Sequence, residues 1–560
     1  MEGACVANPE SEPDTAKWFF LAVLVLLVIG IVVVQLDRTS FRHWKVTYHF
    51  SRTLRQLLPA YIPLTHDLAA FSLRSIIAMA SYMAIVAVFL KQTADYYEND
   101  EGYDTDRAYS FSLGYGALFC AALTIIPVNK SGIIVVLFRI PYDRATKFHR
   151  ICGALTMLLV LVHAIQISDF WGSSEVLTMD TSKELGEAYP AYGLLAACCF
   201  GAMALTAPYP MRSRAYELFQ LVHCLFLPAM IFIMLHVPKS GKILIIPLVL
   251  YGLDGIYRFY QKVLPVENQS VSSPYSKYTV LKVTAKHIEN ILPGQYCLVN
   301  IAEASFFQWH PISICSYDRE THELTFIIKN VGDWTAKICD VVNSAASEGK
   351  GAELKVRLTG TYGRIRFDLG AHPENNTYSY DNLILVAGGI GCTPMISTLQ
   401  WLIDNANDHG NQHRLHVTVL ITARDREMFS LFGDFFRKFN DSKVFQKGGI
   451  DLRLYCTTNQ RPSQVDNPGD KSLEIQTLRC SEGGDDMGSV ANLTVPIAYS
   501  RPNLGKEIET VCQCRESPAG RVCVLVCGPA GIVTAVQKGC HEAVNKFGPV
   551  LDLHEESFRL

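Results

Sequence analysis

Four histidines occupy matching positions in two apolar segments: His149 and His163 in the first, His223 and His236 in the second. The spacings H-x13-H and H-x12-H separate the members of each pair by about 20 Å along a helix. An ionisable residue inside an apolar span is costly and is therefore a functional candidate. Two facing imidazoles can hold a haem iron from both sides. The pattern predicts two stacked haems, one held by His149 and His223 and the other by His163 and His236, against the alternative of histidines that only pack between helices.

The two segments differ in the angle around the helix axis that separates their two histidines. At about 100° per residue, His163 lies roughly 40° from His149 around its helix, whereas His236 lies about 140° from His223. Pro228 stands between the second two. Because a proline kinks a helix, we expect it to rotate the second half of this helix and suit both histidines to ligation.

The apolar residues that must position these histidines are concentrated in the first 260 positions. Of 560 residues, 49% are hydrophobic and 18% charged, and the mean hydropathy is +0.16. This composition excludes a disordered chain, and a formal charge of −3 gives no basic excess for nucleic acid. Each of seven runs is long enough to cross a hydrocarbon core of about 30 Å as a helix. The runs are 18–36, 70–90, 109–127, 149–171, 190–208, 218–237 and 243–260.

The loops between these runs differ in charge. Three alternate loops are basic, with Arg38, Arg42, Lys45, Arg52 and Arg55 in the first, Lys130, Arg139, Arg144 and Lys147 in the second, and Arg212 and Arg214 in the third. The loop at 95–106 is acidic instead. Basic loops face the cytosol, so residues 1–17 are predicted to be an extracytosolic tail. A signal peptide is not expected, because this segment is acidic where a signal peptide is basic and no small-residue cleavage site follows the first run. Seven crossings then place the C-terminal half in the cytosol.

The pattern changes after the membrane domain, which we assign to 18–260. Short β-rich stretches fill 270–370, and strand-like runs followed by helical ones fill 380–560. We predict a β domain followed by an α/β domain. The turn-rich polar stretch near 459–496 is interpreted as a flexible insertion in the second of these domains.

The β domain carries HPISICS at 310–316. An HPxS sequence at the end of a barrel strand resembles the flavin site of the ferredoxin-reductase-like module in membrane ferric reductases and NADPH oxidases. The resemblance implies that Ser313 hydrogen-bonds the isoalloxazine edge and that His310 lies by the flavin phosphates or ribose. IKNVGDWT at 328–335 resembles the flavin-pyrophosphate loop of the family, in which Gly332 permits close backbone approach and Thr335 offers a hydroxyl to phosphate.

The α/β domain begins with LILVAGGIGCTPMIS, a hydrophobic strand that runs into a glycine-rich turn and a helix. Such a turn lets backbone N–H groups approach a pyrophosphate, and the GGxGxTP form resembles the same family. VLVCGPAG at 524–531 matches the family's terminal CGP, which implies that Cys527 lies beside the nicotinamide. Arg424 stands where the family often binds the 2′-phosphate of NADPH, the alternative being a solvated loop charge.

The resemblance implies a fold and a set of site residues. The fold is a multi-pass α-helical membrane domain followed by an antiparallel β-barrel FAD domain and an α/β NADPH-binding domain. No catalytic side chain is expected beyond the electron-transfer cofactors. The expected cofactor-binding residues are His310, Pro311, Ser313, Ser316, Gly332, Trp334, Thr335, Gly388, Gly389, Gly391, Thr393, Pro394, Arg424, Arg501, Cys527, Gly528, Pro529 and the C-terminal aromatic Phe558.

The function implied is transfer of electrons from cytosolic NADPH through FAD and two b-type haems to an acceptor outside. The seven-span layout most resembles the short fungal metalloreductase-like group, which favours ferric or cupric ions as acceptor. A superoxide-producing NADPH oxidase is the alternative, and a non-catalytic membrane scaffold is a third possibility. We expect the lipid bilayer, NADPH and the acceptor as partners and the plasma membrane as the location, with the endoplasmic reticulum as alternative. The sequence points to no protein partner.

Overall fold

The computed structural model describes residues 21, 25, 73–129, 142–177, 179–182, 188–264, 266–275, 277–289, 291–306, 308–347, 354–363, 365, 369, 380–406, 415–433, 435–436, 450–457, 472–474, 494–514, 520–548 and 551–556. The predicted tail 1–17, most of the predicted span 18–36, most of the insertion 459–496 and Phe558 lie outside them. The chain divides into two compact units, Met1–Tyr257 and Arg258–Leu560, and each is described by itself.

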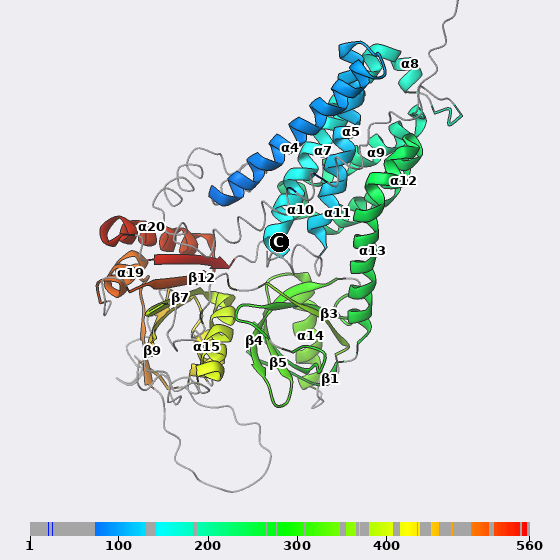
Figure 1. Ribbon diagram of the computed structural model, residues 1–560. Coiled ribbons are helices and arrows are strands. Elements are labelled where there is room, and N and C mark those ends of the chain that lie inside the picture. The colour runs from blue at the N-terminus through cyan, green and yellow to red at the C-terminus, as the bar shows by residue number, and fades with distance from the viewer. Residues whose placement is uncertain are drawn as a thin grey trace, which may run out of the picture. The chain divides into compact units, whose positions relative to one another are not determined.

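The N-terminal unit is helical (Figure 1). Its described elements are α4 (Leu73–Asn99), α5 (Thr105–Ile125), η2 (Ile126–Val128), α7 (Tyr142–Trp171), α8 (Ser173–Val176), α9 (Pro190–Thr206), α10 (Tyr209–Arg214), α11 (Tyr216–His223), α12 (Phe226–His236), η3 (Pro238–Ser240) and α13 (Gly241–Val263), the last of which continues into the second unit.

Four described stretches are long and apolar enough to cross a membrane: Thr105–Val128, Ala145–Asp169, Tyr216–His236 and Pro238–Val263. They coincide with four of the predicted runs. Helix α9 is apolar but shorter, and it covers the predicted run 190–208, while α4 covers most of 70–90. The count of seven spans stays a prediction, because most of the first run is not described.

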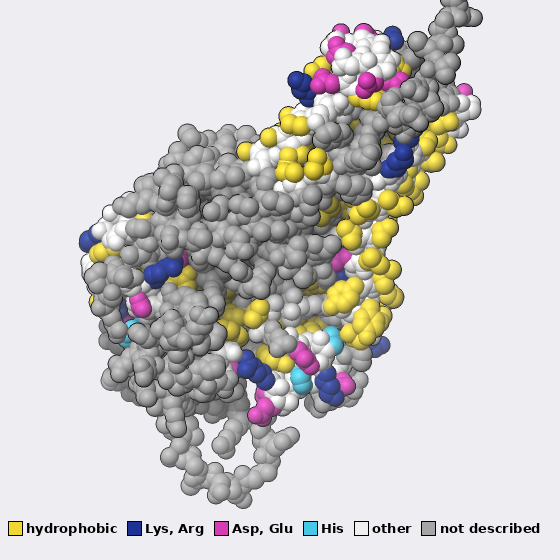
Figure 2. All heavy atoms as spheres, in the orientation of Figure 1, with side chains coloured by type: hydrophobic (Ala, Val, Ile, Leu, Met, Phe, Trp, Pro, Cys, Tyr) yellow, Lys and Arg dark blue, Asp and Glu magenta, His cyan; other side chains and the backbone are white. Residues whose placement is uncertain are grey.

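The helices keep large apolar side chains on their outer surface. Leu161 is 58% exposed on α7, Leu205 77% on α9 and Leu253 58% on α13. Figure 2 shows such side chains along the flank of α12 and α13. Surfaces of this kind are expected against lipid tails rather than water. Inside the bundle, Phe89 and Phe119 stack with ring centroids 4.6 Å apart, so α4 and α5 share a packed core.

The C-terminal unit contains two sheets (Figure 1). The first is antiparallel, in the order β1-β2-β5-β4-β3-β6, and is accompanied by α14 (Asp333–Ser347). Its strands are β1 (Glu267–Tyr275), β2 (Tyr278–Thr284), β3 (Tyr296–Ile301), β4 (His310–Asp318), β5 (Glu323–Lys329) and β6 (Val356–Tyr362). Alternate residues of β2, including Leu281 and Val283, point into its core, as a half-buried strand requires.

The second sheet has the order β10-β11-β9-β8-β7-β12-β13 and is parallel except for β10. Its strands are β7 (Asn382–Gly388), β8 (His416–Ala423), β9 (Ile450–Cys456), β10 (Ser472–Glu474), β11 (Thr494–Ala498), β12 (Val522–Cys527) and β13 (Leu551–Glu556). Its helices are η4 (Gly389–Gly391), α15 (Cys392–Ala406), α16 (Glu427–Leu431), α19 (Leu504–Gln513) and α20 (Ala530–Phe547). Strands β7 and β12 are buried along their whole length, as the centre of a parallel sheet demands.

Candidate functional site

The first histidine pair joins α7 to α11. The ring centroids of His149 and His223 lie 5.9 Å apart, and the ring planes are inclined at 75°. Metal–nitrogen bonds to histidine are about 2.0–2.1 Å long, so two rings that share one metal have centroids about 6 Å apart. The observed separation fits an iron atom held between the two imidazoles.

The helix that carries His223 and His236 is interrupted between them. Helix α11 ends at His223 and α12 begins at Phe226. Because Pro228 has no N–H, it cannot donate to the carbonyl of Cys224. That carbonyl accepts from the N–H of Leu227 instead, at 3.2 Å. The proline therefore falls at an interruption of the helix, as expected from the phase difference of the two histidines.

The second pair joins α7 to the end of α12. His163 Nδ1 lies 2.9 Å from the carbonyl oxygen of Ser110 on α5. His236 Nδ1 lies 2.8 Å from the carbonyl oxygen of Tyr189, the residue that precedes α9. Each imidazole of this pair is thus fixed by the main chain of a neighbouring helix.

These contacts decide which nitrogen of each imidazole ring is available to bind a metal ion. A carbonyl oxygen only accepts hydrogen bonds, so Nδ1 must carry the proton and Nε2 keeps a free lone pair. His149 shares this arrangement, with Nδ1 2.9 Å from the carbonyl oxygen of Thr124. Metal-ligating histidines almost always donate their second N–H in this way.

His223 differs from the other three. Its Nδ1 is buried and has no hydrogen-bond partner among the described residues. Its ring packs instead on Phe219, with centroids 5.1 Å apart. No group of three or more metal-ligating side chains occurs in the described part of the chain. A haem supplies its own equatorial nitrogens and needs only two axial ligands, so pairs of histidines fit a haem and not a bare metal ion.

In the first sheet, the predicted flavin residues gather at the start of β4. His310 stacks on Trp334 from α14, with centroids 4.0 Å apart and planes at 26°. Burial lowers the pKa of His310, so the imidazole is neutral at neutral pH. Ser313 is buried on the same strand opposite Tyr296, and Pro311 and Ser316 flank it along β4.

The loop before α14 is closed by a side chain. The hydroxyl oxygen of Thr335 accepts the N–H groups of Val331 and Gly332, both at 2.9 Å, and the hydroxyl donates to the carbonyl of Gly332. This hydroxyl therefore shapes the loop, and its contact with phosphate stays a prediction. A Cβ at Gly332 would meet no atom within 4 Å, so the backbone there is open to a close ligand.

In the second sheet, the two glycine motifs meet at the carboxyl ends of two neighbouring central strands. Strands β7 and β12 are parallel neighbours, with Ala387 opposite Cys527. A Cβ at Gly388 would lie 2.7 Å from Cδ of Pro529, and one at Gly391 would lie 2.5 Å from the carbonyl oxygen of Cys527. Between β7 and β12 the strand order reverses direction, and the crevice at the carboxyl ends of such strands is the usual nucleotide site of these sheets.

Cys527 is fully buried at the carboxyl end of β12. Burial raises the pKa of its thiol, and the nearby carboxylate of Glu556 adds to this, so the sulfur stays protonated. Glu556 lies opposite Cys527 on β13 and accepts a hydrogen bond from Nε2 of His554 at 2.8 Å. Glu556 was not predicted, because its position depends on the pairing of β12 with β13.

The remaining predicted nucleotide residues surround the carboxyl ends of the same strands. Thr393 donates its hydroxyl to the carbonyl of Ile390 at 3.0 Å, and Pro394 stands in the first turn of α15. Gly389 has a φ of +57°, a left-handed conformation that favours glycine. Arg424 and Arg501 are exposed beyond the ends of β8 and β11, and Gly528 follows β12.

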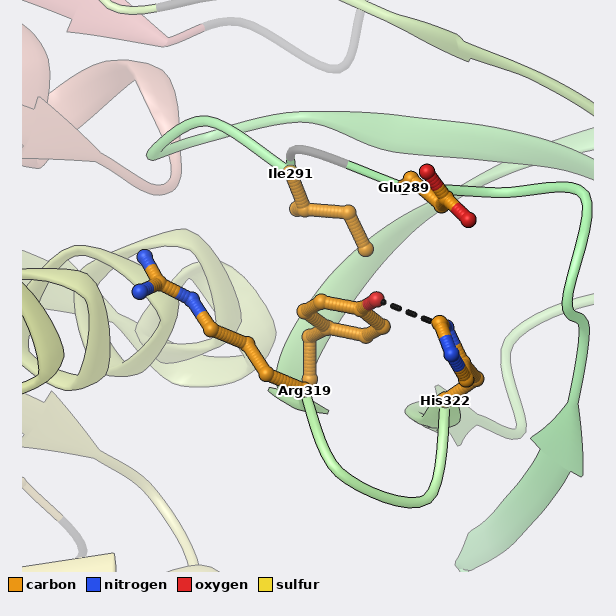
Figure 3. A pocket seen from close by; sticks show the side chains of 5 residues that line it. Glu289, Ile291, Arg319 and His322 are labelled. Carbon is orange, nitrogen blue, oxygen red and sulfur yellow. Dashed lines mark hydrogen bonds between the residues drawn. The ribbon is translucent and has the colours of Figure 1, made fainter.

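A separate cavity of about 260 Å³ lies at the other end of β4 (Figure 3). It is lined by Glu289, Ile291, Tyr317, Arg319 and His322. Tyr317 and His322 hydrogen-bond across it at 3.1 Å. The cavity is thus at the carboxyl end of the strand whose first residues carry the flavin motif.

Three family models match successive parts of the chain. They are the ferric reductase like transmembrane component over 113–234, the FAD-binding domain over 266–366 and the ferric reductase NAD binding domain over 380–541. The chain belongs to the ferric reductase and NADPH oxidase-like family. The predicted fold class is confirmed, with a multi-pass α-helical domain followed by an antiparallel flavin domain and an α/β nucleotide-binding domain.

Curated relatives include members of both branches of this family. Ferric reduction oxidase 5 of Arabidopsis thaliana is 26% identical over 381 residues, covering 65% of this chain and 50% of that protein. A superoxide-generating NADPH oxidase heavy chain of Dictyostelium discoideum is 22% identical over 492 residues, covering 78% and 66%. The chain spans about half the length of the ferric reduction oxidases that it matches. A ferredoxin NADP+ reductase structure from Neisseria gonorrhoeae is 12% identical with a TM-score of 0.32, covering 52% of this chain and 98% of that one.

Proposed function

We propose that the chain transfers electrons from cytosolic NADPH through FAD and two b-type haems to ferric or cupric ions on the other side of the membrane. With a ferric acceptor the balance is NADPH + 2 Fe³⁺ → NADP⁺ + H⁺ + 2 Fe²⁺. When bound, FAD takes up the two electrons of a hydride and passes them singly to haem iron, which carries one at a time. The observation that carries the proposal is the contact between His149 and His223, together with the main-chain hydrogen bonds that fix the other two histidines of the membrane domain.

The side chains of the membrane domain have a ligating role in this proposal. The main-chain carbonyls of Ser110, Thr124 and Tyr189 hold the Nδ1–H groups of three imidazoles, and this leaves on Nε2 the lone pair that would bind haem iron. The surrounding apolar helices would keep water away from groups bound at these histidines.

In this proposal, residues of the C-terminal unit bind and orient the nucleotide. Glycines at 388 and 391 let the turn after β7 approach Cys527 closely, which shapes the nicotinamide pocket. The buried thiol of Cys527 would stay uncharged behind this pocket, because burial raises its pKa. Arg424, which is exposed, would pair with the 2′-phosphate of NADPH, and this contact would favour NADPH over NADH.

Two features support a metal ion as acceptor. Only η3, three residues long, and its flanking residues connect α12 to α13 just after His236, so this connection is too short to fold over the adjacent haem. Acidic side chains gather where α4 ends and α5 begins (Figure 2), among them exposed Glu98, Asp100 and Glu101. Carboxylates are hard oxygen ligands that concentrate cations. The similarity to the Dictyostelium oxidase supports oxygen as the alternative acceptor.

The acceptor is tested by competition in membranes that contain the protein. Ferric-chelate reduction driven by NADPH is measured with and without oxygen, and with and without superoxide dismutase. A metalloreductase reduces the chelate equally under all conditions. If reduction requires oxygen and superoxide dismutase abolishes it, the superoxide-producing oxidase replaces our proposal. A protein without haem in a reduced-minus-oxidised spectrum is a scaffold instead.

We further propose that the protein resides in the plasma membrane with both nucleotide-binding domains in the cytosol. Membrane-impermeant labelling of intact cells then modifies residues of the 95–106 loop and none of the C-terminal unit. If no residue is labelled in intact cells, the endoplasmic reticulum replaces the plasma membrane.

A further inference from the structure

Two glycines of the membrane domain lie directly against the rings of His163 and His236. A Cβ built on Gly114 would stand 2.8 Å from Cε1 of His163, 3.1 Å from Nδ1 and 3.2 Å from Nε2. A Cβ built on Gly193 would stand 2.8, 2.9 and 3.1 Å from the corresponding atoms of His236. All six distances are shorter than an ordinary contact of 3.4 Å or more. The nitrogen-bearing edge of each imidazole therefore faces bare helix backbone.

The same two helices also supply the carbonyl groups that hold these rings. Ser110, whose carbonyl accepts from His163, lies four residues before Gly114 on α5. Tyr189, whose carbonyl accepts from His236, lies four residues before Gly193 on α9. Residues four apart are neighbours on one helix face. Each ring is therefore held by one helical turn, through a carbonyl at one end and a glycine at the other.

We propose that Gly114 and Gly193 are positioning residues that orient the axial imidazoles of one haem, an inference that rests on the proposed function. A side chain at either position would push the Cε1 edge of the ring away. That movement would lengthen the Nδ1–H···O bond or turn Nε2 from the iron. Both effects would change the ligand field of the iron. The reason is that the second hydrogen bond of a ligating histidine sets the orientation and the basicity of the imidazole ring.

The other haem lacks this arrangement. His149 has the carbonyl of Thr124, but the residue four positions later is Val128 rather than glycine. Nδ1 of His223 has no partner among the described residues. The haem of His149 and His223 should therefore be insensitive to substitutions at Gly114 and Gly193, and it serves as an internal reference in the same sample.

The test uses Gly114→Ala and Gly193→Ala in the full-length protein. Haem content, the low-spin electron paramagnetic resonance signals and the midpoint potential of each haem are measured without turnover. Disturbing the hydrogen-bond partner of a ligating histidine costs roughly ten- to hundredfold in metal affinity. We expect one haem to bind that much more weakly, or to shift its resonance and potential, while the other is unchanged.

Matched controls separate ring positioning from general packing. Gly116→Ala on α5 places its Cβ 2.4 Å from Cδ2 of Leu90, a comparable overlap that touches no histidine. Gly201→Ala on α9 meets nothing within 4 Å. Bound FAD reports that the C-terminal unit is folded, and the haem of His149 and His223 reports that the membrane unit is folded.

The outcomes distinguish the two proposals. If the wild-type protein binds no haem, the proposed function fails. If it binds two haems and Gly114→Ala and Gly193→Ala behave like their controls, only the positioning role is overturned. Equal haem loss in Gly114→Ala and Gly116→Ala would also overturn it, because packing between helices would then explain the effect.

Discussion

The substitution Gly391→Ala adds one methyl group against the main chain of Cys527. Its Cβ would stand 2.5 Å from the carbonyl oxygen and 3.0 Å from Sγ, whereas ordinary contacts begin at 3.4 Å. The turn after β7 and the end of β12 must therefore move apart by about 0.9 Å. Overpacking of this kind costs about 1–3 kcal/mol of stability. A displacement of about 1 Å in a reacting geometry can cost roughly a hundredfold in rate.

The rate to measure is anaerobic reduction of bound FAD by NADPH in a stopped-flow instrument, normalised to flavin content. We expect Gly391→Ala to lower the limiting rate about ten- to hundredfold, because Cys527 is moved from the nicotinamide. Gly539→Ala is the matched control. Its Cβ would stand 2.7 Å from Cα of Gly505 where α20 packs on α19, so it strains the same domain away from the carboxyl ends of β7 and β12. A wild-type rate in Gly391→Ala, or an equal loss in Gly539→Ala, would refute the assignment of the nicotinamide pocket.

Three further predictions concern the nucleotide, the acceptor and pH. Arg424→Ala should raise KM for NADPH roughly ten- to hundredfold and that for NADH little, since a charge-assisted hydrogen bond contributes about 1.5–3 kcal/mol; equal changes in steady-state assays contradict this. Burial lowers the pKa of His310, so below about pH 6.5 the unfolded chain binds a proton more readily than the folded one, and the stability of the protein should fall. The thermal midpoint should fall less with decreasing pH in His310→Gln than in the wild type. Identical pH profiles of the two proteins contradict this. Neutralising the acidic loop should lower metal reduction at limiting metal and leave oxygen reduction unchanged; unaffected metal reduction excludes it as an entry site. The residues changed are Asp95, Glu98, Asp100, Glu101, Asp104 and Asp106.

The pairing of histidines at matched depth was open to prediction because helical rise converts sequence spacing directly into distance. His149 and His223 are indeed neighbours. The carbonyl groups that hold the rings were not predictable, since every residue has a carbonyl and no side-chain type marks one. Two of the three carbonyl residues, Ser110 and Tyr189, stand four residues before a glycine, whereas Thr124 stands four residues before Val128.

At the carboxyl ends of β7 and β12, too, some features could be predicted from the sequence and others could not. The hydrophobic run into Gly388 predicts a strand and a turn, but its place beside β12 depends on a sheet order that local patterns do not encode. Glu556 reaches Cys527 only through the pairing of β12 with β13. At Thr335, residue type could not decide between phosphate and the loop's own N–H groups, and the structure shows the second.

The proposed function requires that NADPH reduces two haems held by these histidines. The most direct measurement is anaerobic reduction of the purified protein by NADPH, with flavin and haem absorbance followed together in the wild type and in His163→Ala. We predict flavin reduction followed by reduction of two haems in the wild type. In His163→Ala one haem is lost, flavin reduction persists and reduction of the external acceptor stops. A wild-type protein in which NADPH reduces no haem, or a variant that keeps both haems, would contradict the account.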